Sequence, residues 1–194
     1  MFLIAKLHPH IDDTEKEDYN GLWLSRAAKE ETIRRFYAKK QEIPLCIDHR
    51  DTGRTGFVKD ANRVGRVHDL FLNDKSELMV KCELFNHHKD GYREVNQGMF
   101  RKGERWGVSV GLVNVKDPVT GKKKSRNLVH VALTNDPAFA AEGTYISHWG
   151  LDEEGINKVI RREYYAKGGY YTPEMSAKLE GMLLFYFPPH YLNV

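Results

Sequence analysis

A short apolar run near the middle of the chain, residues 106–112, constrains the fold most, because it places one hydroxyl in a strand that is otherwise apolar. Strand side chains alternate between two faces, so Val108 and Val110 point one way while Ser109 and Gly111 point the other. Glycine inside a strand usually marks a close backbone approach, a bulge or a ligand. The run therefore predicts a core strand whose second face is either solvated or open to a substrate beside Ser109.

The remaining patterns predict a mostly β protein with peripheral helices. Period-two alternation and turn residues indicate strands, whereas apolar spacing of three and four residues behind a capping side chain indicates helices. The expected strands are 2–7, 19–24, 43–47, 63–72, 77–84, 106–115, 128–134 and 144–148. The expected helices are 25–40, with Ser25 as N-cap, a short one around 92–99, and two C-terminal helices capped by Asp152 and Thr172.

Composition limits the classes of protein that fit. The chain has 194 residues, of which 41% are apolar and 29% charged, which favours one globular domain over residues 1–194. Its apolar runs, 1–5 and 181–187, are too short to cross a bilayer, so no membrane partner is expected. Cys46 and Cys82 give neither a disulfide framework nor a zinc spacing, which indicates a reducing, intracellular compartment and predicts no metal and no cofactor. A net charge of +3 with scattered basic clusters does not require nucleic acid.

Two histidines are candidates to act with the serine. His49 follows the apolar strand 43–47, and His130 shares a strand face with the small residue Ala132. A serine is a weak nucleophile until a base takes its proton, and an imidazole suits that task near neutral pH. A base also needs a partner that fixes its tautomer. His130 can fill that role as a neutral acceptor, and Asp136 is the rival carboxylate.

Four ordered blocks carry a family resemblance. They are 43–50 (IPLCIDHR), the hairpin 65–84, 107–110 (GVSV) and 130–133 (HVAL). Together they resemble the herpesvirus capsid maturation protease, assemblin, over about residues 2–145. The resemblance implies that Ser109 is the nucleophile, His49 the general base and His130 the third member. It also implies an antiparallel β-barrel of about seven strands surrounded by α-helices.

One block departs from that family. After the HVAL block the family carries a glycine and paired arginines that help to form the oxyanion hole, whereas this chain reads Thr-Asn-Asp-Pro-Ala-Phe over 134–139. Backbone N–H groups donate whatever the side chain, so Ala138 or Phe139 can serve, while Pro137 has no such hydrogen. This run and the Val-Ser-Val-Gly segment are similar to phage prohead proteases, which implies a divergent member or a phage-type enzyme with a carboxylate third member.

The resemblance also implies partners. The enzyme is expected to cleave a scaffold protein, and its own precursor if the natural chain continues past Val194, in the host nucleus or the procapsid interior. It is expected to act as a homodimer that pairs through the last helix. The interface residues expected on that helix are Met175, Leu179, Met182, Leu183 and Tyr186.

Two other function classes remain open at this point. A non-enzymatic capsid assembly or scaffolding module with the same fold would need no shared geometry between Ser109 and His49. A barrel that binds single-stranded nucleic acid would use stacking aromatics, and the chain has ten tyrosines. Most of those tyrosines fall at positions expected in the core, which favours the protease.

Overall fold

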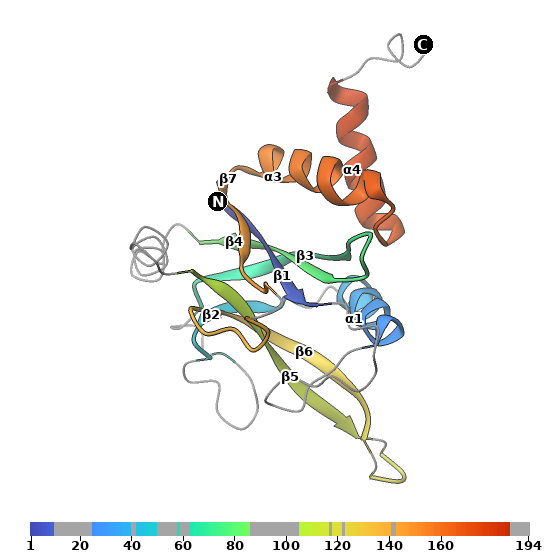
Figure 1. Ribbon diagram of the computed structural model, residues 1–194. Helices are drawn as coiled ribbons and strands as arrows, with labels where there is room; N and C mark the ends of the chain where they lie inside the picture. Colours follow the sequence, from blue (N-terminus) through green and yellow to red (C-terminus); the bar gives the residue numbers. More distant parts are fainter. Residues whose placement is uncertain are drawn as a thin grey trace.

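The computed structural model describes residues 1–9, 25–39, 42–49, 58, 63–85, 105–116, 118–121, 123–140 and 143–186 (Figure 1). These residues form one curled sheet of seven strands, in the order β5-β6-β2-β3-β4-β1-β7. The strands are β1 (Phe2–His8), β2 (Pro44–Ile47), β3 (Gly65–Leu72), β4 (Leu78–Leu84), β5 (Gly107–Lys116), β6 (Lys123–Thr134) and β7 (Ile146–Leu151). The helices are α1 (Arg26–Lys39), α3 (Glu153–Val159) and α4 (Pro173–Tyr186), and a π-helical turn (Ile160–Tyr164) and a 3-10 turn (Tyr165–Lys167) extend α3.

The sheet is mixed, and this corrects the expected architecture. The expectation of a mostly β chain with peripheral helices is confirmed, but the expectation of a closed antiparallel barrel is wrong. β2 pairs in parallel with β6, with Leu45 opposite Val131 and Ile47 opposite Leu133. The other strand pairs of the described sheet are antiparallel. Alternation along a strand shows which face is buried, but it does not encode the direction of a neighbour that lies far away in the sequence.

The two edges of the curled sheet approach each other at the start of β5. Gly107 forms an isolated antiparallel bridge with Tyr145, just before β7. Two backbone hydrogen bonds flank this bridge, from Val108 N to Thr144 O at 3.1 Å and from Ile146 N to Trp106 O at 2.9 Å. The described strands thus form an open half-barrel whose edges touch at one point. The same contact places Pro137 and Thr144 beside Gly107, the first residue of β5.

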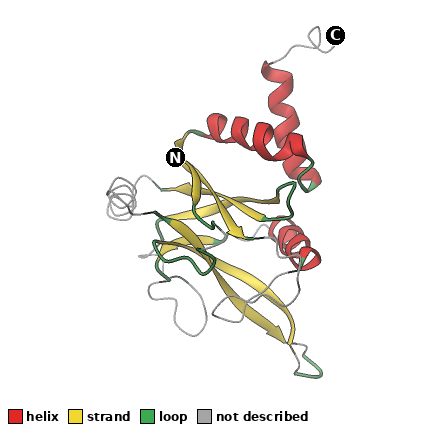
Figure 2. Cartoon of the chain, viewed as in Figure 1, coloured by secondary structure: helices red, strands yellow, loops and turns green. Residues whose placement is uncertain are grey.

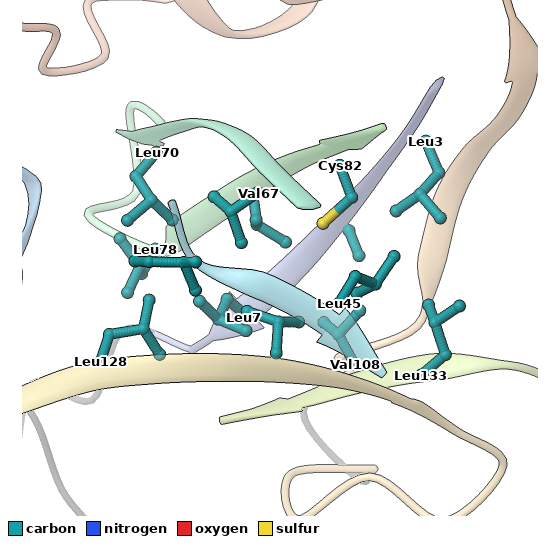
Figure 3. Close-up of a cluster of buried hydrophobic side chains, with 14 of the residues drawn as sticks. Leu3, Leu7, Leu45, Val67, Leu70, Leu78, Cys82, Val108, Leu128 and Leu133 are labelled. Carbon is teal, nitrogen blue, oxygen red and sulfur yellow. The ribbon is translucent and has the colours of Figure 1, made fainter. Parts of the chain in front are cut away.

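Two apolar cores lie on opposite faces of the sheet. Inside the curl, side chains from six strands pack together, among them Leu3, Leu45, Val108 and Leu133 (Figure 3). On the outside, α3 and α4 cover β1, β3 and β4 (Figure 2). That second cluster consists of Phe2, Ile4, Phe71, Met79, Ile156, Ile160, Met175 and Leu179. None of the described helices is long and apolar enough to cross a bilayer.

The capping signals read from the sequence are confirmed. Ser25 Oγ accepts from Ala28 N at 3.2 Å, Asp152 Oδ1 from Gly155 N at 2.7 Å, and Thr172 Oγ1 from Met175 N at 3.3 Å. Each bond satisfies an N–H in the first turn of its helix. The hairpin of β3 and β4 is also confirmed, whereas β6 begins at Lys123 rather than at residue 128. The strand expected at 19–24 and the helix expected at 92–99 lie outside the described residues.

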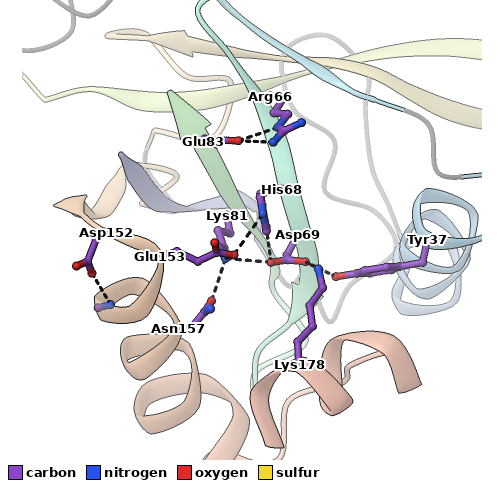
Figure 4. A network of polar contacts seen from close by, with 11 residues as sticks. Tyr37, Arg66, His68, Asp69, Lys81, Glu83, Asp152, Glu153, Asn157 and Lys178 are labelled. Carbon is purple, nitrogen blue, oxygen red and sulfur yellow. Dashed lines mark hydrogen bonds and ion pairs between the residues drawn. The ribbon is translucent and has the colours of Figure 1, made fainter. Parts of the chain in front are cut away.

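A buried carboxylate joins the outer face of the sheet to three helices. Asp69 on β3 is 1% exposed and accepts hydrogen bonds from Tyr37 of α1, at 3.1 Å, and from His68, at 2.9 Å (Figure 4). The ammonium groups of Lys81 and Lys178 lie 3.3 and 3.4 Å from its oxygens. Burial by itself would raise the pKa of Asp69, but the His68 hydrogen bond and the two lysine charges outweigh it and hold the pKa below its ordinary value.

The same cluster extends to α3 through Lys81, which is also 1% exposed. Its ammonium donates to Asn157 Oδ1 at 2.9 Å and lies 3.6 Å from Glu153 Oε1. A charge buried this deeply needs its partners, because an unpaired buried ion pays the full cost of desolvation.

Removing Asp69 should therefore destabilise the fold strongly. We expect Asp69→Ala to lower the free energy of unfolding by about 3–5 kcal/mol, since Lys81 loses its nearest buried carboxylate. Chemical denaturation followed by circular dichroism measures the change. Glu83→Gln is the control: it breaks the more exposed pair with Arg66, held at 2.7 Å, and should cost about 1 kcal/mol or less. Equal losses in the two variants would contradict the assigned role of Asp69.

Candidate active site

Ser109 lies on the outer face of the sheet, as the alternation predicts. Val108 is 1% exposed and belongs to the core inside the curl. Ser109, its neighbour on β5, is half-buried and pairs with Ala132 of β6. A single methyl group therefore stands opposite the hydroxyl across the strands.

His130 lies on the same outer face of the same strand pair. It is paired with Gly111, two residues beyond Ser109, and its side chain is 3% exposed. Residues two apart on a strand share a face, so the hydroxyl of Ser109 and the imidazole of His130 project to the same side. The expectation that His130 shares a face with Ala132 is confirmed.

His49 reaches this face through a strained turn at the end of β2. Asp48 and His49 have φ angles of 49° and 52°, in the left-handed region that non-glycine residues seldom adopt. Asp48 N remains bonded to Leu133 O at 2.9 Å, so the chain leaves β2 still attached to β6. The two left-handed residues reverse the chain and bring the His49 imidazole back over β6. Such conformations cost roughly 1–3 kcal/mol each and persist only where surrounding contacts fix them.

Cys46 supplies one of those contacts. It stands opposite Ala132 in the parallel pair, is fully buried, and its sulfur accepts a hydrogen bond from the backbone of His49. Burial raises the pKa of the Cys46 thiol to about 11, so the group is a neutral thiol at physiological pH. Cys46 therefore supports the turn that carries His49 and is not a nucleophile.

The two histidines are hydrogen-bonded to each other. His49 Nδ1 lies 2.6 Å from His130 Nε2, with ring centroids 4.9 Å apart and the rings inclined at 70°. Burial, reinforced by His130, lowers the pKa of His49 below its ordinary value against a smaller opposing effect of Asp48. In a neutral His49 that donates from Nδ1 to His130, the acceptor nitrogen of the ring is Nε2.

The structure brings these three residues to one face, but of the two hydrogen bonds that a Ser109–His49–His130 triad needs, the described part of the chain contains only the one between the histidines. Among the described residues no hydrogen bond joins the Ser109 hydroxyl to His49. The described partner of the His49 ring is His130. Asp136 is exposed, and its backbone N–H donates to Thr134 Oγ1 at 3.1 Å. The arrangement thus favours His130 over Asp136 as the partner of His49.

The expected oxyanion donors lie in the turn that folds along β5. A Cβ placed on Gly107 would be 3.0 Å from Pro137 Cγ, so the proline packs on the strand two residues before Ser109. Within the turn, Ala140 N donates to Pro137 O at 3.0 Å and Thr144 N donates to Phe139 O at 3.3 Å. The backbone N–H groups of Ala138 and Phe139 donate to no described residue. Both amides belong to the turn that begins at Pro137, the residue that packs on Gly107.

The residues expected at a dimer interface are placed differently. Met175 and Leu179 are each 1% exposed and pack in the second core of the same chain, so they hold α4 to the sheet instead of facing a partner. The side chains of Met182, Leu183 and Tyr186 lie outside the described residues, although the helix itself continues away from the sheet there (Figure 1). The homodimer stays a prediction, which sedimentation at rising protein concentration would test.

Two features of the site were not found from the sequence. The glycines beside Ser109 were expected to leave room for a substrate, yet the space above Gly107 is filled by Pro137 and the Thr144 carbonyl, and that above Gly111 by His130. The role of Cys46 was also missed, because the sequence showed only that Cys46 and Cys82 form neither a disulfide framework nor a zinc spacing. The available signal was the spacing 107–109–111, which puts both glycines on the face of the serine.

The described residues contain no group of three or more histidine, cysteine, aspartate or glutamate side chains arranged to hold a metal ion. Compared with protein-family models and with curated proteins, the chain finds no match in either set.

The histidine pair gives a titration that can be measured directly. We expect the His49 ring to become protonated only below the ordinary histidine value of 6.5, because burial and His130 disfavour its charged form. Ring proton and nitrogen shifts recorded by NMR against pH measure this pKa. His130→Ala should raise it, since the change removes the neighbouring imidazole and admits water. A His49 pKa at or above 6.5 in the unmodified protein would contradict the described environment.

Proposed function

We propose that the chain is a serine endopeptidase that cleaves an internal scaffold protein during the maturation of a viral capsid. The observation that carries the proposal is the hydrogen-bonded pair of His49 and His130 on the sheet face that bears Ser109. The residue blocks that resemble the assemblin family supply the proposed substrate class. The described geometry supports the chemistry of a hydroxyl nucleophile with an imidazole base.

In the proposed reaction, Ser109 Oγ attacks the scissile carbonyl carbon while its proton passes to His49 Nε2. His130 accepts the Nδ1–H of His49, which fixes the tautomer of the base and shares the charge that develops on it. The backbone N–H groups of Ala138 and Phe139 stabilise the oxyanion. His49 then gives the proton to the leaving amine, and water hydrolyses the acyl-enzyme by the same route.

The missing bond between Ser109 and His49 is compatible with this scheme. In free enzymes the catalytic hydrogen bonds are often long or poorly aligned, and they shorten when a substrate excludes water. Here the base sits on a turn of two left-handed residues, whereas the nucleophile sits on a regular strand. Substrate binding then needs to adjust the turn rather than the sheet.

We further propose that the substrate adds a strand to the open edge of β5. Val108 N donates away from β6, to Thr144 O, so the backbone groups of Val110, two residues on, face the same edge. Val110 has no described partner on that edge. An extended peptide that pairs there would pass directly beside Ser109, and its affinity would come largely from backbone hydrogen bonds.

Active-site variants test the assigned roles. We expect Ser109→Ala and His49→Ala each to lower kcat/KM for a scaffold-derived peptide by more than about 1000-fold. His130→Ala should cost less, on the order of 100-fold, because it orients a base without carrying the proton. A fluorophosphonate probe should label the unmodified protein and fail to label Ser109→Ala.

Ser147→Ala is the matched control for these variants. Ser147 Oγ also contacts a histidine, with His148 Nδ1 at 3.1 Å, but it lies on β7 and should retain full activity. Undiminished turnover by Ser109→Ala, or loss of turnover by Ser147→Ala, would reject the assignment. A protein that never reacts with the probe and cleaves no peptide would favour a non-enzymatic scaffold module.

Substrate length tests the strand-addition mode. A decapeptide that spans the cleavage site should be cleaved with a kcat/KM at least about 100-fold above that of a dipeptide ester with the same leaving side, since each pair of backbone bonds adds binding energy. N-methylation of the peptide bonds expected to pair with Val110 should remove most of the advantage. Equal turnover of the short ester and the long peptide would contradict binding along β5.

A further inference from the structure

Gly111 lies directly beneath the imidazole of His130. The two residues are paired across β5 and β6, and a Cβ on Gly111 would come within 2.0 Å of His130 Cε1, 2.2 Å of Nδ1 and 2.3 Å of Nε2. All three distances are far below van der Waals contact, and they involve three atoms of one ring. The ring therefore rests on the Cα of Gly111, in space that any other residue would occupy with its own side chain.

A bulge at the same position turns His130 toward β2. Gly111 pairs with His130 but the next residue, Leu112, pairs with Leu128, so Val129 is left as an extra residue of β6. An extra residue in one strand bends it locally and changes the direction of the adjacent side chain. The ring thus has β5 on one side and the His49 ring on the other, at a centroid distance of 4.9 Å.

We propose that Gly111 is a positioning residue of the active site: it allows His130 to lie flat on β5, which is the placement that brings His130 Nε2 to His49 Nδ1. This inference rests on the proposed function and adds to it a residue that touches neither the substrate nor the reacting atoms. A methyl group at position 111 would lift the ring off the strand. The 2.6 Å bond to His49 would then break, and the tautomer of His49 would no longer be fixed.

A purely structural glycine would behave differently, and a double-mutant cycle separates the two roles. The four proteins are the unmodified chain, Gly111→Ala, His130→Ala and the double variant. If Gly111 acts through His130, Gly111→Ala should lower kcat/KM by about as much as His130→Ala, on the order of 100-fold, with KM changed by less than about threefold. In the double variant the alanine fills the space left by the ring, so its activity should equal that of His130→Ala alone.

Gly181→Ala is the control for replacing a glycine as such. Its Cβ would meet no atom within 4 Å, and the variant should keep full activity. If Gly111→Ala fails to fold, the double variant keeps the proposal testable, because removal of the ring should restore folding. A double variant that is no better folded than Gly111→Ala would overturn the proposal.

NMR separates failure of this inference from failure of the proposed function. The imidazole nitrogen shifts of His49 and His130 report their hydrogen bond whether or not the protein cleaves peptides. We expect the shifts to show the bond in the unmodified protein and its loss in Gly111→Ala. Retention of the bond and of full activity in Gly111→Ala would overturn the positioning role. Loss of the bond in a chain that cleaves no peptide would reject the protease and leave the role of Gly111 in place.

Discussion

The parallel pairing of β2 with β6 is the constraint on which the rest of the structure depends. Three residues of β2 lie in register with 131–133, and two of them, Leu45 and Ile47, point into the core inside the curl. β6 is the strand through which the β5–β6 hairpin joins the remaining sheet. The same short pairing sets Cys46 opposite Ala132. It ends just before Asp48, and the next residue, His49, is hydrogen-bonded to His130. Fold and candidate site are thus products of one contact between strands.

Buried charges, in addition to the apolar faces, attach the helices to this sheet. Lys29 of α1 is fully buried, and its ammonium donates to Pro9 O at 2.6 Å and to Ser76 O at 3.1 Å. Asp69 and Lys81 do the same for α3 and α4 on the outer face. Hydrogen bonds to a charged group are directional, so they fix the position of a helix where apolar packing alone would tolerate sliding. Among the described residues, the apolar cluster under α3 and α4 takes its strand residues from β1, β3 and β4, and none from the β5 strand that carries Ser109.

Local signals account for most of what the sequence predicts correctly. Ser25, Asp152 and Thr172 begin helices because a short side-chain oxygen can satisfy the first-turn N–H groups, and this depends on neighbouring residues alone. The face of Ser109 follows from strand alternation in the same way. The direction of β2 relative to β6 depends on residues more than 80 positions away, and no local pattern encodes it. The turn at Asp48 and His49 contains no glycine, so its left-handed geometry was also invisible in the sequence.

The separation of His49 and His130 along the chain has a consequence for the order of folding. They are 81 positions apart, and closing a loop of that length costs about 4 kcal/mol of chain entropy beyond a constant term. One hydrogen bond between neutral imidazoles contributes about 0.5–1.5 kcal/mol, so it cannot close the loop unaided. The strands β2 and β6 must dock first, and such non-local parallel pairing is slow compared with hairpins and helices. We therefore expect the histidine pair to be among the last contacts to form, after synthesis has passed β6. Until then the nascent chain has no His49 base that is held in place by His130.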